Sequence, residues 1–441
     1  MVTAPPDAPG DRRAVPAPPS EPAGGLSVLR GVLDRPLASY YLLLSSCGLL
    51  LVIGLAMVFS ATSVRAYKEY GNAYMFVTKQ ALYAVVGLLA FWVCQRLPAR
   101  TYRSLGKPLL VVSSILLVLL DLLSLLQSAK IIKSAALGPF VADNLWLHLG
   151  PVQVQPSELA KFALVLWGAD VLVRMGPAVG WWRQLLYPLF TGVAVLFLLV
   201  GYNDLGTMLC LLILFVGLLW AAGVRLRVFA GMSVVALLGV ALLVKVHSDY
   251  RWGRLTAFAH PETCDRQFGC YQVQQGFYAI ARGGWFGAGL GNGSLKWGWL
   301  PNEHNDFIFA VIAEELGVVG CFVVLALFAV LTYTGLRIAR RVDDPFRRLA
   351  ATAVTAWLVG QATINIGGVV GLLPITGLPL PFISDGGSAL VVTFAAVGML
   401  ASFARAEPDA ARALHARPPA KWVRLLWAPL PPLPARRRGG V

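Results

Sequence analysis

The chain has 441 residues, of which 57% are hydrophobic and 13% are charged, and its mean hydropathy is +0.68. This composition excludes an ordinary soluble domain, whose surface needs far more charge to stay in water. The formal net charge of +15 is strongly basic. A membrane protein carries such charge against anionic lipid, so nucleic-acid binding is not indicated. Motifs for ATP hydrolysis or nicotinamide binding, such as a P-loop, are absent from the sequence.

A helix needs about 20 mainly apolar residues to cross a hydrocarbon core roughly 30 Å thick. The sequence contains apolar runs of this kind, separated by charged or turn residues. In chain order the ten runs are 40–60, 77–94, 108–126, 159–173, 185–201, 205–223, 228–246, 307–336, 350–373 and 388–403. The sequence therefore predicts an all-α polytopic membrane protein with ten transmembrane helices.

Positive charge in the loops predicts the orientation, because Lys and Arg are retained on the cytoplasmic side. With the N-terminus inside, the short cytoplasmic loops hold more Lys and Arg than the longer outside loops. Both termini are then cytoplasmic, and 247–306 forms a large extracytoplasmic loop. This gives a disordered N-terminal tail at 1–36, a membrane domain at 37–405 and a basic, Pro-rich C-terminal tail at 406–441.

The C-terminal tail contains one apolar group within its basic sequence, made up of Trp422, Leu425, Leu426 and Trp427. Two interpretations of this group remain. It forms a patch that binds the membrane interface or a partner, or it belongs to an ordinary solvated basic tail. The residues by themselves favour neither interpretation.

The six cysteines divide between the spans and the large loop. Four of them fall inside predicted spans, where cysteine is ordinarily a small buried hydrophobe: Cys47, Cys94, Cys210 and Cys321. Cys264 and Cys270 lie in the extracytoplasmic loop, which is an oxidising setting. They form either a disulfide that closes a short loop or two free thiols.

Polar residues placed where hydrocarbon is expected are costly unless they are paired or hydrated, so they mark candidate sites. The fourth span opens with QPSELAK at 155–161, where Pro156 and Ser157 suit the start of a helix. Glu158 and Lys161 are three residues apart and therefore share one helical face. We expect a buried ion pair facing the bundle interior, with either a functional role or a purely structural one.

The motif NDLGT at 203–207 forms a short polar corner between the fifth and sixth spans. As a bare pattern it is typical of a tight turn in which Asp204 caps the next helix. A structural role is therefore what these residues favour by themselves.

The loop at 247–306 is the only sizeable predicted segment outside the membrane apart from the tails. Its many irregularly spaced glycines do not form a phosphate-binding fingerprint; they indicate tight turns or a re-entrant segment at the membrane surface. Asp306 ends the loop, and its plain interpretation is a helix N-cap. However, His304 precedes it and Glu314 and Glu315 follow, and such a concentration of ionisable groups at the mouth of a bundle is typical of functional sites.

The segment at 373–389 reads LPITGLPLPFISDGGSA. It is too broken by Pro and Gly to form a continuous helix. Broken helices are tolerated in membrane domains where they line a cavity, so we expect this segment to face one.

Five motifs in this order resemble those of the SEDS family, the membrane peptidoglycan polymerases FtsW and RodA. They are QPSELAK at 155–161, NDLGT at 203–207, YQ at 271–272, LPNEHNDFIFAVIAEELG at 300–317 and GLPLPFISDGG at 377–387. The resemblance covers about 36–405 and includes the ten-span topology. The run DFIFAVIAEELG and the long Pro- and Arg-rich tails make the chain more similar to FtsW, the division-associated branch, than to RodA.

The resemblance implies that the substrate is lipid II, which is polymerised into β-1,4-linked glycan strands during septal cell-wall synthesis at the bacterial cytoplasmic membrane. It implies that Asp306 is the catalytic residue. The positions it suggests for substrate contacts are Gln155, Glu158, Lys161, Asp204, Gln272, His304 and Ser384. It also implies a bound Mg²⁺ or Mn²⁺, a class B penicillin-binding protein similar to FtsI as partner, other membrane proteins of the division machinery, and membrane lipid.

Two places depart from the family pattern. Leu145 stands before Trp146 where the family frequently has arginine, and Asp385 stands where tyrosine is more usual, followed by Ala389 in place of serine. These departures leave the assignment of substrate contacts at the two places open, whereas Asp306 is retained.

Glycan polymerisation needs a base at the attacking hydroxyl and positive charge at the departing diphosphate. Asp306 is the expected base, and Lys161, oriented by Glu158, is the expected fixed cation. One displacement at an α-linked diphosphate inverts the anomeric centre and gives the β linkage without a second catalytic carboxylate. The alternatives are a flippase that moves lipid II through a polar cavity, a RodA-type elongation polymerase, and a scaffold for a transpeptidase.

Overall fold

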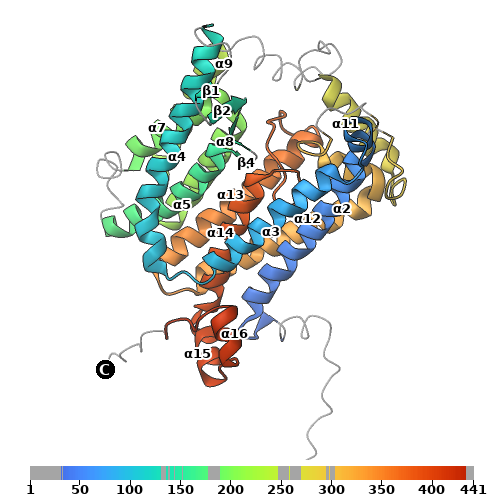
Figure 1. Cartoon of the computed structure of the whole chain (residues 1–441). Helices are drawn as coiled ribbons and strands as arrows, with labels where there is room; N and C mark the ends of the chain where they lie inside the picture. The colour runs from blue at the N-terminus through green and yellow to red at the C-terminus, as the bar shows by residue number, and fades with distance from the viewer. Residues whose placement is uncertain are drawn as a thin grey trace, which may run out of the picture.

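The computed structural model of the chain is a bundle of long helices with a small sheet near one end (Figure 1). The structure describes residues 31, 33–130, 136–137, 140–143, 145–150, 152–176, 189–246, 258, 270–294, 297 and 303–433. Within this part of the chain, six helices are long and apolar enough to cross a membrane. They are α2 (Ala38–Tyr70), α3 (Met75–Cys94), α4 (Ala99–Ser128), α12 (Ile308–Arg341), α13 (Pro345–Val369) and α14 (Ser388–Arg405).

The other four predicted spans also coincide with helices. These are α5 (Pro156–Met175), α7 (Thr191–Asn203), α8 (Leu205–Ala221) and α9 (Leu226–Val246). The apolar parts of α7, α8 and α9 are only 10–17 residues long, and α5 carries Glu158, Lys161 and Asp170. The positions of the predicted helices are therefore confirmed, and the count of ten crossings stays a prediction.

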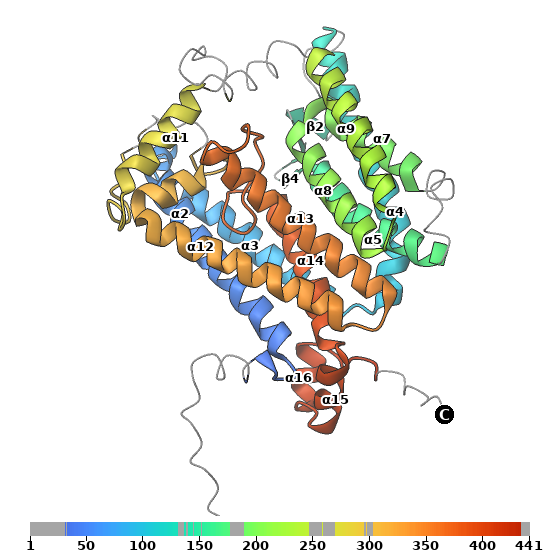
Figure 2. The ribbon, with the colours of Figure 1, turned by 180° about the vertical axis from the view of Figure 1, so that it is seen from behind.

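The helices form two groups that meet at α13 (Figures 1 and 2). Helices α2, α3, α12 and α14 pack together on one side, and α4, α5, α7, α8 and α9 lie on the other. Helix α13 contacts α12 in the first group and both α5 and α8 in the second. Because it has protein on both sides, α13 is buried along most of its length, and its polar side chains Gln361 and Asn365 face other residues rather than lipid.

Small residues allow two of the helix pairs to pack closely. A Cβ atom on Gly106 of α4 would lie 2.8 Å from the backbone nitrogen of Trp167 in α5. A Cβ atom on Gly398 of α14 would lie 2.5 Å from the carbonyl oxygen of Phe91 in α3. Helices in lipid associate largely through such close packing, so a larger residue at either position would push the two helices apart.

A four-stranded antiparallel sheet stands between α4 and α5, so the all-α prediction is wrong for this segment. The strands follow one another as β1 (Ala136–Leu137), β2 (Phe140–Asp143), β3 (Trp146–Leu149) and β4 (Val152–Val154). Pairing of β2 with β3 runs from Phe140 opposite Leu149 to Asp143 opposite Trp146. The stretches between turn residues are too short to nucleate a helix. Gly150, at φ 60°, adopts a conformation that suits a tight turn between strands.

The long loop before α12 is tied to a break in that helix. Gly317 has φ 66° and ψ −164°, which interrupts α12, and residues 283–294, which follow α11 (Cys270–Gly283), pack into the break. The buried side chains of Glu314 and Glu315 accept hydrogen bonds from backbone N–H groups of this segment. Glu315 also accepts a hydrogen bond from Ser60 of α2 at 2.6 Å. The glycine-rich part of the loop is therefore a set of tight turns hydrogen-bonded to α12.

The cysteines in the spans carry free thiols, as expected. Cys47 and Cys210 are buried, and Cys94 and Cys321 are half-buried. Cys264 lies outside the described residues, so the alternative of a disulfide or two free thiols in the large loop stays a prediction.

The C-terminal tail is structured over much of its length. After α14 the chain forms α15 (Pro408–Ala416) and α16 (Lys421–Leu426), which lie at the end of the bundle next to the start of α2 (Figures 1 and 2). Ala410 and Ala411 of α15 are fully buried. A purely solvated tail is therefore wrong for 408–416, whereas α16 has no buried residue and both interpretations of its apolar group stay open. Residues 1–30 of the N-terminal tail lie outside the described part of the chain.

Candidate functional site

Asp306 directly precedes α12, but it does not cap that helix. The N-cap residue is Phe307, and no side chain makes a capping hydrogen bond there. Phe307 is only 1% exposed, and its ring packs beside Gly276 of α11. Because the buried Phe307 occupies the N-cap position, the N-cap interpretation of Asp306 is wrong. The carboxylate of Asp306 therefore does not cap α12.

Asp306 lines a small pocket between the start of α12, α13 and the broken segment. The other lining residues are Phe307, Ile364, Asn365, Gly368, Val369, Ile375, Thr376, Gly377 and Leu378. A Cβ atom on Gly377, which has φ +78°, would lie 3.7 Å from Oδ2 of Asp306. The carboxylate thus lies close to bare backbone of the broken segment, and the prediction that this segment lines a cavity is confirmed.

Asn365 of α13 holds the backbone on two sides of this pocket. Its Nδ2 donates to the carbonyl oxygen of Asp306 at 2.9 Å and to that of Leu378 at 2.7 Å. The side chain is 5% exposed, so water could not readily replace these hydrogen bonds. Asn365 therefore fixes the loop that carries the carboxylate against the broken segment.

Ser384 makes a second link between the same two segments. Its Oγ donates to the carbonyl oxygen of Asn305 at 2.7 Å and accepts from the N–H of Leu380 at 2.7 Å. The carbonyl oxygen of Ser384 accepts from Nε2 of Gln80 in α3 at 3.0 Å. The residue expected to touch substrate is thus buried in this structure, where it positions the residue just before Asp306.

Glu158 and Lys161 form the buried ion pair predicted from their spacing. Nζ of Lys161 donates to Oε1 of Glu158 and to Oε1 of Gln361, each at 2.7 Å. It also lies 5.2 Å from the ring centroid of Trp357. Both charged residues have 0% exposure, and neither belongs to the residues that line the Asp306 pocket.

Gln361 connects this ion pair to the broken segment, and sequence reasoning missed it. Its Nε2 donates to the carbonyl oxygen of Pro379 at 2.8 Å, next to the Leu378 carbonyl that Asn365 binds. Gln361 and Asn365 are four residues apart and share one face of α13. The sequence contained a signal for both residues, namely two side-chain amides four residues apart in an apolar span. Uncharged polar groups inside a membrane bundle also need hydrogen-bond partners, so such a pair marks a buried contact.

Asp204 caps α8 as its pattern predicted. Oδ1 accepts from the N–H of Thr207 at 2.9 Å and Oδ2 from its hydroxyl at 2.5 Å. The adjacent Gly206 packs against the broken segment, where a Cβ atom would lie 2.6 Å from the carbonyl oxygen of Thr376. Asp204 therefore supports a wall of the pocket without lining it.

Two predicted contact residues lie away from the pocket. The N–H of Gln155, at the start of α5, donates to Oγ of Ser388 at the start of α14 at 2.9 Å. Gln272 is half-buried on α11 and is not among the residues that line the pocket.

His304 is a neutral neighbour of the site. Its ring centroid lies 5.7 Å from that of Phe76, and its carbonyl oxygen accepts the N–H of Asp385 at 3.0 Å. Burial, assisted by the positive charge of Arg65, lowers the pKa of His304 to about 4. The imidazole is therefore uncharged near pH 7 and does not supply a cation for a diphosphate.

A metal held by the protein alone does not fit the described residues. Among them, no group of three or more His, Cys, Asp or Glu side chains could hold a metal ion. The pocket offers one carboxylate, from Asp306, and Mg²⁺ bound by a single carboxylate takes its other ligands from water and substrate phosphates. A Mg²⁺ or Mn²⁺ ion that arrives with a diphosphate stays a prediction.

The model of the cell cycle protein family that is named for FtsW, RodA and SpoVE matches residues 41–408. This chain belongs to that family. The matched region contains the buried ion pair, the Asp306 pocket and every helix from α3 to α14.

Curated relatives in the FtsW branch cover most of the chain. The probable peptidoglycan glycosyltransferase FtsW of Mycobacterium tuberculosis is 42% identical over 400 residues, which is 90% of this chain and 74% of the relative. The protein of the same name from Geobacter metallireducens is 37% identical over 348 residues, which is 79% of this chain and 89% of the relative.

Solved structures share the fold. A chain of a peptidoglycan synthase complex that coordinates polymerization and crosslinking has a TM-score of 0.64 and 25% identity, covering 85% of this chain and 98% of that chain. The rod shape determining protein RodA of Thermus thermophilus has a TM-score of 0.57 and 24% identity, covering 83% and 96%. The helical architecture of this family member is therefore the RodA fold.

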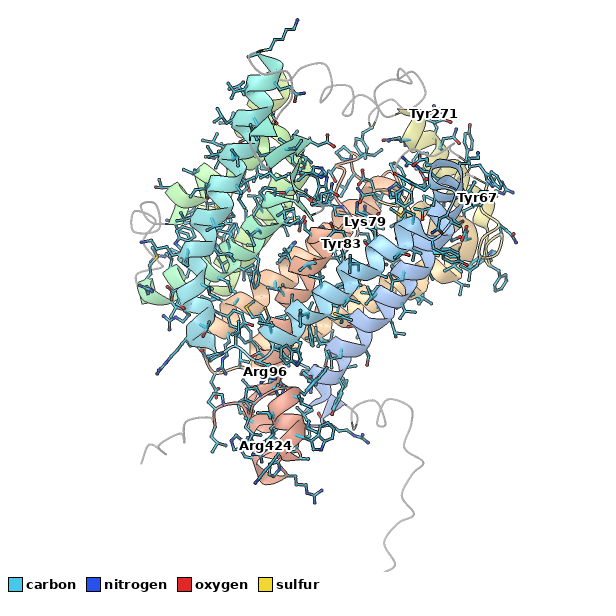
Figure 3. The ribbon with its side chains drawn as sticks, in the orientation of Figure 1. Tyr67, Lys79, Tyr83, Arg96, Tyr271 and Arg424 are labelled. Atoms are coloured by element: carbon cyan, nitrogen blue, oxygen red, sulfur yellow. The ribbon has the colours of Figure 1, made fainter. Side chains whose placement is uncertain are left out.

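Asp385, where this chain departs from the usual residue of the family, gives a test of stability against pH. Burial raises the pKa of its carboxyl to about 6, although the positive charge of Lys79 (Figure 3) opposes the rise. Unfolded aspartate titrates near 4, so the folded state loses relative stability as pH rises from about 4 to 6. We expect Asp385→Asn to raise the free energy of unfolding by on the order of 1–2 kcal/mol at pH 7.5 and to have little effect at pH 4.

Thermal unfolding of the detergent-solubilised protein across this pH range would check the prediction. Asp143→Asn, which changes an exposed carboxylate of β2, serves as the control and should show no such pH-dependent gain. An equal effect of Asp385→Asn at both pH values would contradict the assigned pKa.

Proposed function

We propose that this chain is a peptidoglycan glycosyltransferase of the FtsW type, which joins lipid II units in β-1,4 linkage during septal wall synthesis and releases undecaprenyl diphosphate. The observation that carries the proposal is the carboxylate of Asp306 in a pocket whose walls are held by Asn365 and Ser384. Family membership and the names of the FtsW relatives support the same activity.

We infer that the pocket faces the extracytoplasmic side. Asp306 stands at the start of α12, and Arg340 and Arg341 end that helix after 34 residues. The part of α12 after its break at Gly317, residues 318–341, spans about 36 Å. This length is enough to cross the hydrocarbon core, and arginine is retained on the cytoplasmic side. The ten-span topology with both termini in the cytoplasm follows from the same rule and belongs to this proposal.

In the proposed reaction, Asp306 acts as a general base. It takes the proton of the acceptor sugar hydroxyl while that oxygen attacks the anomeric carbon of the donor. The bond from this carbon to the diphosphate oxygen breaks at the same time, and the electron pair leaves with the diphosphate. A single displacement inverts the α-linked donor to a β linkage. The diphosphate leaves as an anion, so no second carboxyl group has to protonate it.

Lys161 supports this site from within the bundle. Its Nζ is fully buried and held by Glu158 and Gln361, so direct contact with a diphosphate would require the helices to move. We propose that Lys161 fixes Gln361 and, through it, the broken segment that walls the pocket. Its charge also favours an anionic leaving group, because charges act over longer distances where water is excluded.

The experiment that tests the proposal is polymerisation of purified lipid II by the purified chain in detergent, alone and together with a co-purified class B penicillin-binding protein. We expect glycan strands in at least the second preparation. Their absence from both would contradict the proposal. Loss of strands after chelation, restored by added Mg²⁺ or Mn²⁺, would support the metal prediction, and unchanged synthesis would contradict it.

A lipid II flippase is the second candidate function. The observation that favours it is the charged network of Glu158, Lys161 and Gln361 inside the spans, since transporters place such groups along substrate pathways. Sealed vesicles containing the chain separate the two functions. Movement of lipid II across the bilayer without glycan formation would support the flippase, and glycan formation in detergent, where no sides exist, would support the polymerase.

The partner and the location are part of the proposal. A class B penicillin-binding protein is the proposed partner, supported by the structural likeness to a synthase complex that coordinates polymerization and crosslinking. The proposed location is the cytoplasmic membrane at the division septum, because the chain is most similar to the FtsW branch. We therefore expect a fluorescent fusion of this chain to accumulate at the septum. A fusion spread along the cell sides would instead favour a RodA-type role.

Asn365→Ala is expected to lower the polymerisation rate by about 10–100-fold, because it frees the backbone of Asp306 and a small displacement of a catalytic group costs this much. If Asn365 positions the base, kcat falls while KM for lipid II changes little. The matched control is Thr363→Ala on the exposed face of the same helix, where the hydroxyl bonds only the carbonyl of Val359. A rise in KM for lipid II with unchanged kcat would contradict the positioning role.

A further inference from the structure

The segment after α14 is held on the end of the bundle through its backbone. Three successive carbonyl groups, at 426–428, accept hydrogen bonds from side chains of α3, of the two residues that follow it, and of α14. Trp92 Nε1 and Arg96 Nη1 donate to Leu426 at 2.6 and 3.0 Å, Gln95 Nε2 to Trp427 at 3.3 Å, and Arg405 Nη2 to Ala428 at 3.3 Å. We call these contacts the backbone latch. The backbone latch uses carbonyl groups of the main chain. The side chains of α16 do not take part in these four hydrogen bonds.

One side chain completes the latch from within. Nε1 of Trp427 donates to the hydroxyl of Tyr40 at 2.6 Å, and that hydroxyl donates to Oε1 of Gln95 at 3.2 Å. Tyr40 and Gln95 are buried at the ends of α2 and α3. The position of α16 relative to two membrane spans is therefore set by polar contacts, and the contact between Trp427 and Tyr40 is partly buried.

The outward face of α16 is apolar. Trp422, Leu425 and Leu426 are spaced i, i+3 and i+4, so they share one helical face, and they are 67%, 73% and 60% exposed. A helix of six residues has little stability of its own in water. Contiguous large apolar side chains left exposed in this way mark a surface that binds something.

The flanks of this face are basic. Arg417 and Lys421 are exposed and Arg424 is half-buried, and the stretch 417–433 contains no acidic residue. Arg96, just after α3, adds its charge at the same end of the molecule as Arg424 (Figure 3). An apolar face bordered by Lys and Arg is complementary to a lipid surface with anionic head groups.

The level of α16 also matches a membrane surface. The latch joins it to Trp92 and Gln95, at the point where the membrane span α3 ends. The neighbouring part of α3 has exposed apolar side chains, such as Leu89 at 58% and Val93 at 43%. The apolar face of α16 therefore lies next to the end of a span with exposed apolar side chains, at the level where hydrocarbon is expected to give way to head groups.

We propose that α16 is an interfacial anchor that binds anionic phospholipid of the membrane in which the protein sits. Trp422, Leu425 and Leu426 enter the edge of the acyl region, and Lys421 and Arg424 bind head-group phosphates. The backbone latch holds the helix at that depth. This role is independent of the Asp306 pocket.

Hydrogen–deuterium exchange of the full chain in nanodiscs tests the proposal. One set of discs contains phosphatidylcholine alone, and the other contains phosphatidylcholine with phosphatidylglycerol. Backbone amides of α16 should exchange about tenfold more slowly in the anionic discs, since each basic residue adds to binding at such a surface. Lys421→Gln together with Arg424→Gln should abolish this difference, and Trp422→Ser together with Leu425→Ser should remove protection in both kinds of disc.

Arg412→Gln is the matched control, because Arg412 is also basic and exposed but pairs with Asp409 within α15 at 2.7 Å. It should keep the lipid-dependent difference. Thermal unfolding of the bundle should be similar in all variants, which shows that the spans have folded. Equal exchange of the unmodified chain in both kinds of disc would overturn the proposal, as would protection that appears only when a soluble protein is added.

Discussion

Asp306→Asn is expected to abolish polymerisation of lipid II while the protein still folds and inserts. Asparagine has nearly the same shape as aspartate, and the backbone hydrogen bond from Asn365 to residue 306 does not depend on the side chain. The amide cannot take a proton from the acceptor hydroxyl. Loss of a general base lowers rates by about 10²–10⁴-fold. The measurement is the rate of glycan strand formation by the purified variant, scaled to the amount of folded protein.

Asp143→Asn provides a matched control for the Asp306 variant. Asp143 is also an aspartate outside the long spans, but it lies exposed at the end of β2. Exposed substitutions away from a site usually change little, so this variant should polymerise at close to the normal rate. If Asp306→Asn retained a tenth or more of the normal rate, Asp306 would not be the base, and the carboxylate would have to act by holding substrate or metal.

Lys161→Ala is expected to have the largest effect on stability. It leaves the carboxylate of Glu158 at 0% exposure without the cation that now lies 2.7 Å away. Removing one partner of a buried ion pair typically costs about 3–5 kcal/mol. Expression and thermal unfolding in detergent should both show the loss. Polymerisation should fall as well, because Gln361 and the broken segment lose their support.

The double variant Glu158→Gln with Lys161→Met separates stability from function. It removes both charges, so most of the lost stability should return, while the rate of polymerisation stays low. Arg412→Ala is the matched control for burial, because Arg412 and Asp409 have the same i, i+3 spacing and the same 2.7 Å distance but are 66% and 59% exposed. Its stability should change by at most about 1 kcal/mol. Normal polymerisation by the double variant would reduce the buried pair to a structural role.

The site illustrates how far local sequence reasoning reaches. Asp306 was a candidate because ionisable groups gather around it, yet the sequence left a helix cap as the plain alternative. The structure decided between them, because the buried Phe307 and not Asp306 occupies the N-cap position of α12. The helix cap at Asp204 was predictable because the carboxylate that accepts the hydrogen bond and the N–H of Thr207 that donates it are only three residues apart. The sheet after α4 was missed because short strands leave a weaker pattern than a span does.

The amino-acid sequence alone determined that this is a multi-span membrane protein, where its helices lie, that Glu158 and Lys161 share a face, and which family it resembles. These properties depend on residues within one or two helical turns and on their solubility in hydrocarbon. Only the tertiary structure decided that Asn365, Ser384 and Gln361 are the residues holding the site. Their partners lie 59, 79 and 200 residues away along the chain. Hydrogen bonds over such separations exist only when distant helices pack, and no local pattern records which amide will meet which carbonyl or amine.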